Sequence, residues 1–238
     1  MKTIAIFGAG PGLGMAVARR FAREGFRVAL VARDAGRLAS MAGDLAAAGV
    51  EAAGFPADLT DAAAALRAVD EIQARFGPVD VLEYGPTPGE HLRGSPSELD
   101  VAAVARLLDL YVLTPVALVG RVLPGMLERG DGGLLFAMGA AAKYPMPRLA
   151  GGMVLSSLRT YAHTLNAELG PKNVYAGTLV IGALIEGSAA ARNPSAWGNG
   201  EVPVVAAGDL AGRCWDLYAR RDRAEEQVTP GLAASLDS

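Results

Sequence analysis

Short apolar runs alternate with amphipathic segments along most of the chain. The runs at 4–7, 27–32, 51–56, 79–84, 132–138 and 174–181, with a further one at 224–228, have the length and composition of buried strands. Apolar residues recur at helical spacing over 15–22, 34–48, 61–76, 97–129, 149–169 and 204–220. Alternating strands and helices are typical of a parallel sheet covered by helices on both faces. The pattern therefore predicts an α/β fold, a single doubly wound domain over 1–238 with about seven parallel strands.

A glycine-rich turn follows the first strand. Gly8, Gly10, Gly12 and Gly14 stand between the apolar run at 4–7 and the first helical pattern. Glycines let the backbone turn sharply and approach a ligand closely, and the free N–H groups of a helix N-terminus attract a pyrophosphate. Strand, turn and helix in this order predict a dinucleotide site of the Rossmann type.

The spacing of these glycines narrows the prediction. Leu13 stands where G-x-G-x-x-G would have its third glycine, whereas Gly8, Gly12 and Gly14 fit G-x-x-x-G-x-G. That spacing resembles the TGxxxGxG turn of the short-chain dehydrogenase/reductase family, with Phe7 in place of the usual threonine. The resemblance covers nearly the whole chain. It implies an oxidoreductase whose cofactor phosphates lie on Gly8, Gly10, Gly12, Leu13 and Gly14.

The end of the second strand bears on the choice of cofactor. An acidic residue there would bind the ribose hydroxyls of NAD, and an arginine favours the extra phosphate of NADP. Ala32 is uncharged and Arg33 follows it, with Arg37 one helical turn further on, while Asp34 has the position of a helix N-cap. We therefore expect NADP, with NAD less favoured. The alternative is that Arg33 is a solvated surface residue.

Other segments match the family near its cofactor. Asp58 and Leu59 stand where the family has an aspartate and an apolar residue against the adenine; Asp58 can also cap a helix starting near Thr60. Gly85 falls in the loop that follows the fourth strand, where the family's Asn-Asn-Ala-Gly motif is lost. Gly182 and Leu184 lie in the turn whose backbone meets the nicotinamide amide in the family.

The family's catalytic residues have no counterpart in the chain. The resemblance implies a tyrosine, a lysine four residues later, a serine and an asparagine, but no Tyr-x-x-x-Lys occurs. Depending on register, the tyrosine position holds Gly151 or Gly152, the lysine position Leu155 or Ser156, and the serine position Met138 or Gly139. The asparagine position holds Tyr111. Because the chemistry needs a general acid near the cofactor, we consider Tyr111 first, then Tyr84, then Tyr144, which has Lys143 beside it. A packing or surface role is the alternative for each.

Three functions fit this pattern. The first is an atypical NADP-dependent oxidoreductase acting on a small, fairly apolar carbonyl or alcohol substrate. The second is a non-redox lyase, isomerase or cyclase, with Glu83 or His91 as acid or base. The third is a non-catalytic NADP-binding sensor or scaffold. For a substrate pocket we expect Met138, Met153, Leu155 and Trp197, under a lid at about 186–202.

Composition limits the partners. A net charge of −3 gives no electrostatic footprint for nucleic acid. One cysteine, Cys214, indicates a reducing cytoplasm, and with only His91 and His163 beside it a structural metal site is not expected. No apolar stretch is long and uninterrupted enough to span a bilayer, despite a mean hydropathy of +0.27, so no membrane partner is expected. The chain goes straight into a strand and then the glycine turn, so no signal peptide is expected either. The apolar helix at 97–129, with a kink at Pro115, matches one that packs between subunits in the family and implies a homodimer or homotetramer.

Overall fold

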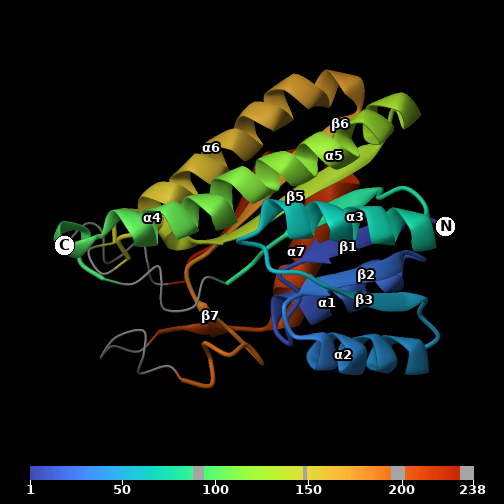
Figure 1. Ribbon diagram of the computed structural model, residues 1–238, viewed down its shortest axis with the longest axis horizontal. Helices are drawn as coiled ribbons and strands as arrows, with labels where there is room; N and C mark the ends of the chain where they lie inside the picture. Colours follow the sequence, from blue (N-terminus) through green and yellow to red (C-terminus); the bar gives the residue numbers. More distant parts are fainter. Residues whose placement is uncertain (88–93, 147–148, 194–201, 231–238) are drawn as a thin grey trace.

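Seven parallel strands form the central sheet of the protein (Figure 1). The structure, a computed structural model, describes residues 1–87, 94–146, 149–193 and 202–230. The strand order is β3-β2-β1-β4-β5-β6-β9, which confirms the predicted doubly wound sheet. The strands are β1 (Thr3–Phe7), β2 (Arg27–Ala32), β3 (Ala52–Pro56), β4 (Val81–Tyr84), β5 (Gly132–Gly139), β6 (Val174–Ile181) and β9 (Glu225–Val228).

Helices cover both faces of this sheet. On one face, α3 (Ala62–Phe76), α5 (Thr114–Arg129) and α6 (Gly152–Leu169) pack over strand residues that include Phe7, Leu82 and Phe136. On the other face, α1 (Leu13–Ala22), α2 (Ala35–Ala47) and α7 (Ala207–Arg220) pack over residues that include Ile6 and Leu135. Figure 1 shows α5 and α6 side by side above the sheet. Since every central strand is buried on both sides, its sequence reads as a continuous apolar run.

Aspartate caps set two of the helix starts. Asp34 accepts a hydrogen bond from the Arg37 amide at 3.0 Å, as the sequence predicts for an N-cap. Asp61, rather than Asp58, caps α3 through the amides of Ala63 and Ala64. The interpretation of Asp58 as the cap of that helix is therefore wrong.

The long apolar helix is broken near the expected proline. It consists of α4 (Val101–Leu108), a π-helical turn η3 (Asp109–Leu113) and α5. Pro115 lacks the N–H that would bond the carbonyl of Tyr111 four residues earlier, and the π turn lies directly before it. A short 3-10 turn, η2 (Pro96–Glu98), precedes α4.

The same helix corrects the expectation that no segment could span a bilayer. The continuous helical segment Val101–Arg129 is long and apolar enough to do so, with a mean hydropathy of 1.7 in its most apolar stretch. Only 28% of that stretch is buried. The few charged residues in the middle of this helix do not lower its mean hydropathy enough to exclude a membrane span.

The remaining elements are short and lie at both ends of the strands, with η5 directly before the start of β6. The 3-10 turns η4 (Ala140–Ala142) and η5 (Gly170–Lys172) follow β5 and α6. Two short strands, β7 (Leu184–Ile185) and β8 (Val204–Val205), pair in parallel, so the last helix begins at Ala207 rather than at the predicted Val204.

Candidate active site

The turn between β1 and α1 has the geometry of a phosphate cradle. Gly8 has φ of +93°, and a Cβ atom at this position would lie 2.5 Å from the Cα of Pro86. A Cβ at Gly14 would lie 2.9 Å from the Cα of Ala9. Only glycine fits these two positions, because a side chain would meet backbone in both. Among the described residues, a Cβ on Gly10 would meet nothing nearer than the Gly8 carbonyl oxygen at 4.0 Å, which leaves the outer side of the turn open.

Unused backbone donors line this turn. The amides of Gly8 and Ala9 donate to the carbonyl of Val31, at 2.9 and 3.0 Å. Within the described part of the chain, the amides of Gly12, Leu13 and Gly14 donate to no protein acceptor. Amides at the start of a helix without internal partners suit an anionic ligand. The residues present therefore fit the pyrophosphate of a dinucleotide.

Arg33 is exposed at the carboxyl end of β2. Among the residues that the structure describes, it forms no ion pair, whereas the guanidinium of Arg37 lies 3.3 Å from the Asp34 carboxylate. Arg33 is thus the uncommitted cation at the position where the sequence places the NADP phosphate. Arg37 is partly occupied by the helix cap.

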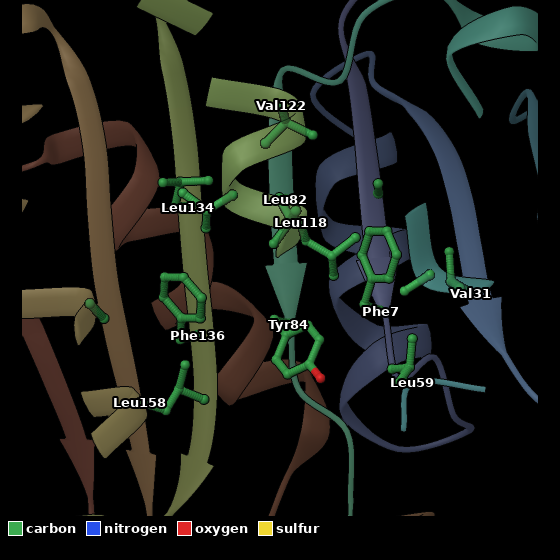
Figure 2. Close-up of a cluster of buried hydrophobic side chains, with 14 of the residues drawn as sticks. Phe7, Val31, Leu59, Leu82, Tyr84, Leu118, Val122, Leu134, Phe136 and Leu158 are labelled. Atoms are coloured by element: carbon green, nitrogen blue, oxygen red, sulfur yellow. The ribbon is translucent and has the colours of Figure 1, made fainter. Parts of the chain in front are cut away.

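Asp58 and Leu59 follow β3 at the same edge. Asp58 Oδ1 accepts hydrogen bonds from the amide and hydroxyl of Thr60, at 3.0 and 2.9 Å. Its side chain is therefore oriented by a local turn, with its second oxygen uncommitted. Leu59 is 5% exposed and belongs to the core cluster with Phe7 (Figure 2), so it forms the floor of this edge rather than a projecting contact.

Gly85 was expected in a loop beside the cofactor, and Gly182 and Leu184 in the turn that meets the nicotinamide. Gly85 donates its amide to the Phe7 carbonyl at 2.9 Å, and Gly182 donates to Val228 at 2.9 Å. The Leu184 amide donates to the Pro203 carbonyl at 2.8 Å. This bond begins the β7–β8 pair, so the amides of Gly85, Gly182 and Leu184 all have protein acceptors in this structure.

Tyr84 and Tyr111 are core residues. Figure 2 shows the Tyr84 ring among buried side chains beside Phe7. Its hydroxyl donates to the Leu110 carbonyl, and the Tyr111 hydroxyl donates to the Pro86 carbonyl at 2.9 Å. Burial raises the pKa of both phenols, further above the range useful to a general acid. Both bonds tie β4 and its following loop to the π turn, and thereby fix Pro86 against Gly8.

Tyr144 lies in a different environment. It follows η4, is half-buried, and its hydroxyl donates to Gln227 Oε1 at 3.0 Å. The Lys143 ammonium lies 5.7 Å from the centroid of the Tyr144 ring. The sequence brought Lys143 and Tyr144 together only as neighbours. It gave no signal for Gln227, because that residue comes from β9, far along the chain.

Glu83 is enclosed beneath the site. It is 2% exposed, and its Oε1 has no hydrogen-bond partner among the residues that the structure describes. Burial raises the pKa of Glu83 to about 8. The cavity that it lines with Leu135, Gly177 and Cys214 has no room for a water molecule. Burial also raises the pKa of the Cys214 thiol, with a further contribution from Glu83. The carboxyl group is therefore sealed from substrate, which argues against Glu83 as acid or base.

The expected pocket residues are dispersed. Met138 and Leu155 are buried in the core, and Met153 is 57% exposed. Trp197 and His91 lie outside the described residues. The first part of the expected lid is described: a Cβ on Gly12 would lie 3.1 Å from the Cβ of Ser188. This segment therefore lies directly against the cradle.

Comparison with known proteins gives consistent matches. A family model described as short chain dehydrogenase matches residues 2–191. A short chain dehydrogenase of Pseudocercospora fijiensis is 30% identical over 176 residues, which are 71% of this chain and 55% of that protein. The chain spans about half the length of the curated relatives it matches first.

Solved structures agree in fold. L-Sorbose reductase of Gluconobacter frateurii, complexed with NADPH and L-sorbose, has a TM-score of 0.86 at 22% identity, over 97% of this chain and 96% of that one. A short-chain dehydrogenase of Sphingobium yanoikuyae in complex with NADPH has a TM-score of 0.81 at 25% identity, over 100% of this chain and 91% of that one.

Proposed function

The chain belongs to the short-chain dehydrogenase/reductase family, and from this premise we propose that it is an NADP-dependent oxidoreductase. The proposed reaction interconverts a carbonyl and an alcohol on a small, fairly apolar substrate. The observation that carries the proposal is the glycine cradle, in which the amides of Gly12, Leu13 and Gly14 have no acceptor among the described residues, together with the uncommitted Arg33 at the carboxyl end of β2. NADPH, when bound, would supply the hydride.

Arg33 would distinguish the two nicotinamide cofactors. Its guanidinium can pair with the phosphate on the adenosine ribose, which NADH lacks. Arg33→Ala should weaken NADPH binding by about 10-fold or more and leave NADH binding within about twofold. Fluorescence titration with each cofactor measures both constants, and Arg67→Ala, which removes an exposed arginine of α3, is the matched control. Equal weakening of the two cofactors would refute the assignment.

For the proton donor, we now place Tyr144 before Tyr111 and Tyr84, whereas the sequence placed it last. Tyr111 and Tyr84 are enclosed and bonded to backbone carbonyls, whereas Tyr144 is half-buried and has a lysine over its ring. These observations support Tyr144 as the donor and packing roles for the other two. Proton transfer from a positioned side chain contributes about 100-fold or more to a rate, so Tyr144→Phe should lower turnover by that factor.

One assay distinguishes the proposed oxidoreductase from the two other functions that fit the sequence. The purified protein is incubated with NADPH and with benzaldehyde, acetophenone or octanal, and absorbance of the reduced nicotinamide is followed. Oxidation of NADPH supports the proposal. Tight NADPH binding without change in any substrate would instead indicate the sensor or scaffold. Conversion of a substrate without change at the nicotinamide would indicate the lyase, isomerase or cyclase.

We propose further that a second copy of the chain covers the long helix. Its exposed apolar side chains include Leu108, Leu113, Val116 and Leu127, and exposed apolar area of this kind marks an association surface. A homodimer or homotetramer would bury it without a membrane. Sedimentation in the absence of detergent tests this: a monomer that binds lipid vesicles would refute it. With one buried thiol, the proposed compartment is the cytoplasm.

A further inference from the structure

A polar network connects the edge strand β9 to the segment after β5. β9 pairs in parallel with β6, and the register places Thr178 opposite Glu225 and Val180 opposite Gln227. Because side chains alternate along a strand, Glu225 and Gln227 share one face. That face is turned toward α6 and η4, where both side chains find their partners.

Glu225 is the centre of the network. Its carboxylate accepts hydrogen bonds from Arg159 at 2.5 and 3.0 Å and from Lys143 at 3.3 Å. His163 Nε2 lies 3.1 Å from it and the Thr178 hydroxyl 3.2 Å. Burial by itself would raise the pKa of Glu225, but Arg159, Lys143 and Gln227 outweigh it and lower that pKa to about 2. Glu225 is therefore an anion held rigidly by a two-pronged arginine contact.

Gln227 links the rigidly held Glu225 carboxylate to the Tyr144 hydroxyl. Its Nε2 donates to Glu225 Oε1 at 2.6 Å. Since an ionised carboxylate only accepts hydrogen bonds, the amide nitrogen must face Glu225. The amide oxygen is then left to accept the Tyr144 hydroxyl at 3.0 Å. The direction of the phenol is thus set by a chain of bonds that begins at Arg159.

The network ends beside the turn at Gly182. Val228, next to Gln227, accepts the Gly182 amide at 2.9 Å, and a Cβ on Gly182 would lie 3.3 Å from the Cβ of Ala140. Tyr144 itself donates its amide to the Ala140 carbonyl at 2.9 Å. The phenol, the end of β9 and the turn expected at the nicotinamide therefore belong to one contact group.

We propose that Glu225 and Gln227 are positioning residues that hold Tyr144 as the proton donor to the substrate oxygen. The inference rests on the proposed function. NADPH, when bound, would supply the hydride for the new C–H bond. The Tyr144 hydroxyl would turn from Gln227 Oε1 to the substrate, its O–H bond would break, and its proton would pass to the carbonyl oxygen. The half-buried Tyr144 then regains a proton from solvent. The Lys143 ammonium lies 5.7 Å from the centroid of the Tyr144 ring and 3.3 Å from Glu225 Oε1, so the network includes a cation beside this ring.

Gln227→Met and Gln227→Glu test the positioning step. Gln227→Met removes the acceptor at nearly constant volume, and kcat with NADPH and benzaldehyde should fall about 10-fold or more while KM and NADPH affinity stay within about twofold. In Gln227→Glu, a protonated carboxyl can donate to Glu225 and accept from Tyr144 as the amide does. Its turnover should approach that of the wild type at acid pH and be lost as the pH rises.

Two controls and one measurement without cofactor complete the test. Gln73→Met and Tyr161→Phe make the same changes outside the network and should leave kcat unchanged. In protein carrying ring-labelled tyrosine, Gln227→Met should shift the NMR signal of Tyr144 and not that of Tyr161. Wild-type turnover that Gln227→Met and Tyr144→Phe both retain would overturn this inference and leave the proposed function intact. A wild type that binds NADPH and oxidises none of it with any of the carbonyls would overturn both.

Discussion

The buried carboxyl group of Glu83 should make the free energy of unfolding depend on pH. The carboxyl group lies between the sheet and α7, where Oε1 has no partner in the described part of the chain and there is no space for water. An ion in such a place loses its hydration without compensation, so the folded protein should keep the proton. Glu83→Gln retains the shape of the side chain and removes the ionisation. The two proteins should therefore differ in how their stability depends on pH.

The size and sign of the difference follow from the pKa. Burial raises it from 4.5 to about 8. At about 1.4 kcal/mol for each unit, the full effect is about 5 kcal/mol. Below pH 4.5 the acid is protonated in both the folded and the unfolded state, and the stability is fully present. Between 4.5 and 8 only the unfolded state releases the proton, so stability falls as pH rises, and above 8 it levels off.

Urea unfolding at intervals from pH 5 to pH 9 measures this dependence. The wild type should lose stability relative to Glu83→Gln steadily up to about pH 8, and the difference removes contributions from groups that both proteins share. An amide in the same cavity adds a cost that does not change with pH, so the slope is the informative quantity. Glu71→Gln, an exposed change on α3, should follow the wild type. Parallel curves for wild type and Glu83→Gln would refute the reasoning.

Three further changes test other parts of the structure. Gly8→Ala should cost about 2 kcal/mol or more of unfolding free energy and abolish NADPH binding, because φ is positive and Pro86 blocks a Cβ; Gly43→Ala, on open helix surface, should stabilise by about 0.5–1 kcal/mol in the same urea titration. Tyr111→Phe should cost about 1 kcal/mol through the lost hydrogen bond to Pro86 yet retain NADPH turnover, and loss of turnover would restore Tyr111 as the donor. Val116→Glu, at an exposed position on α5, should give monomers in sedimentation with unchanged helicity by circular dichroism; an unchanged oligomer would place the interface elsewhere.

The sequence determined the fold and the cofactor cradle because both depend on local order. Continuous apolar runs mark strands buried on two faces, and the glycines at 8, 12 and 14 are required where backbone meets backbone. The structure agrees with both in strand order and in the close contacts of the turn. The same local reasoning placed Asp34 at a helix N-cap, where it is found.

The tertiary structure decided which polar residues meet. Tyr111 and Tyr84 have the same residue type as Tyr144, but burial against the sheet raises the pKa of the first two. Gln227 contacts Tyr144 only because β9 closes the edge of the sheet beside β6. Such contacts join residues more than eighty positions apart, and no spacing along the chain encodes them. The sequence thus determined the glycine turn that we propose for a dinucleotide, and three-dimensional packing decided which tyrosine we propose beside it.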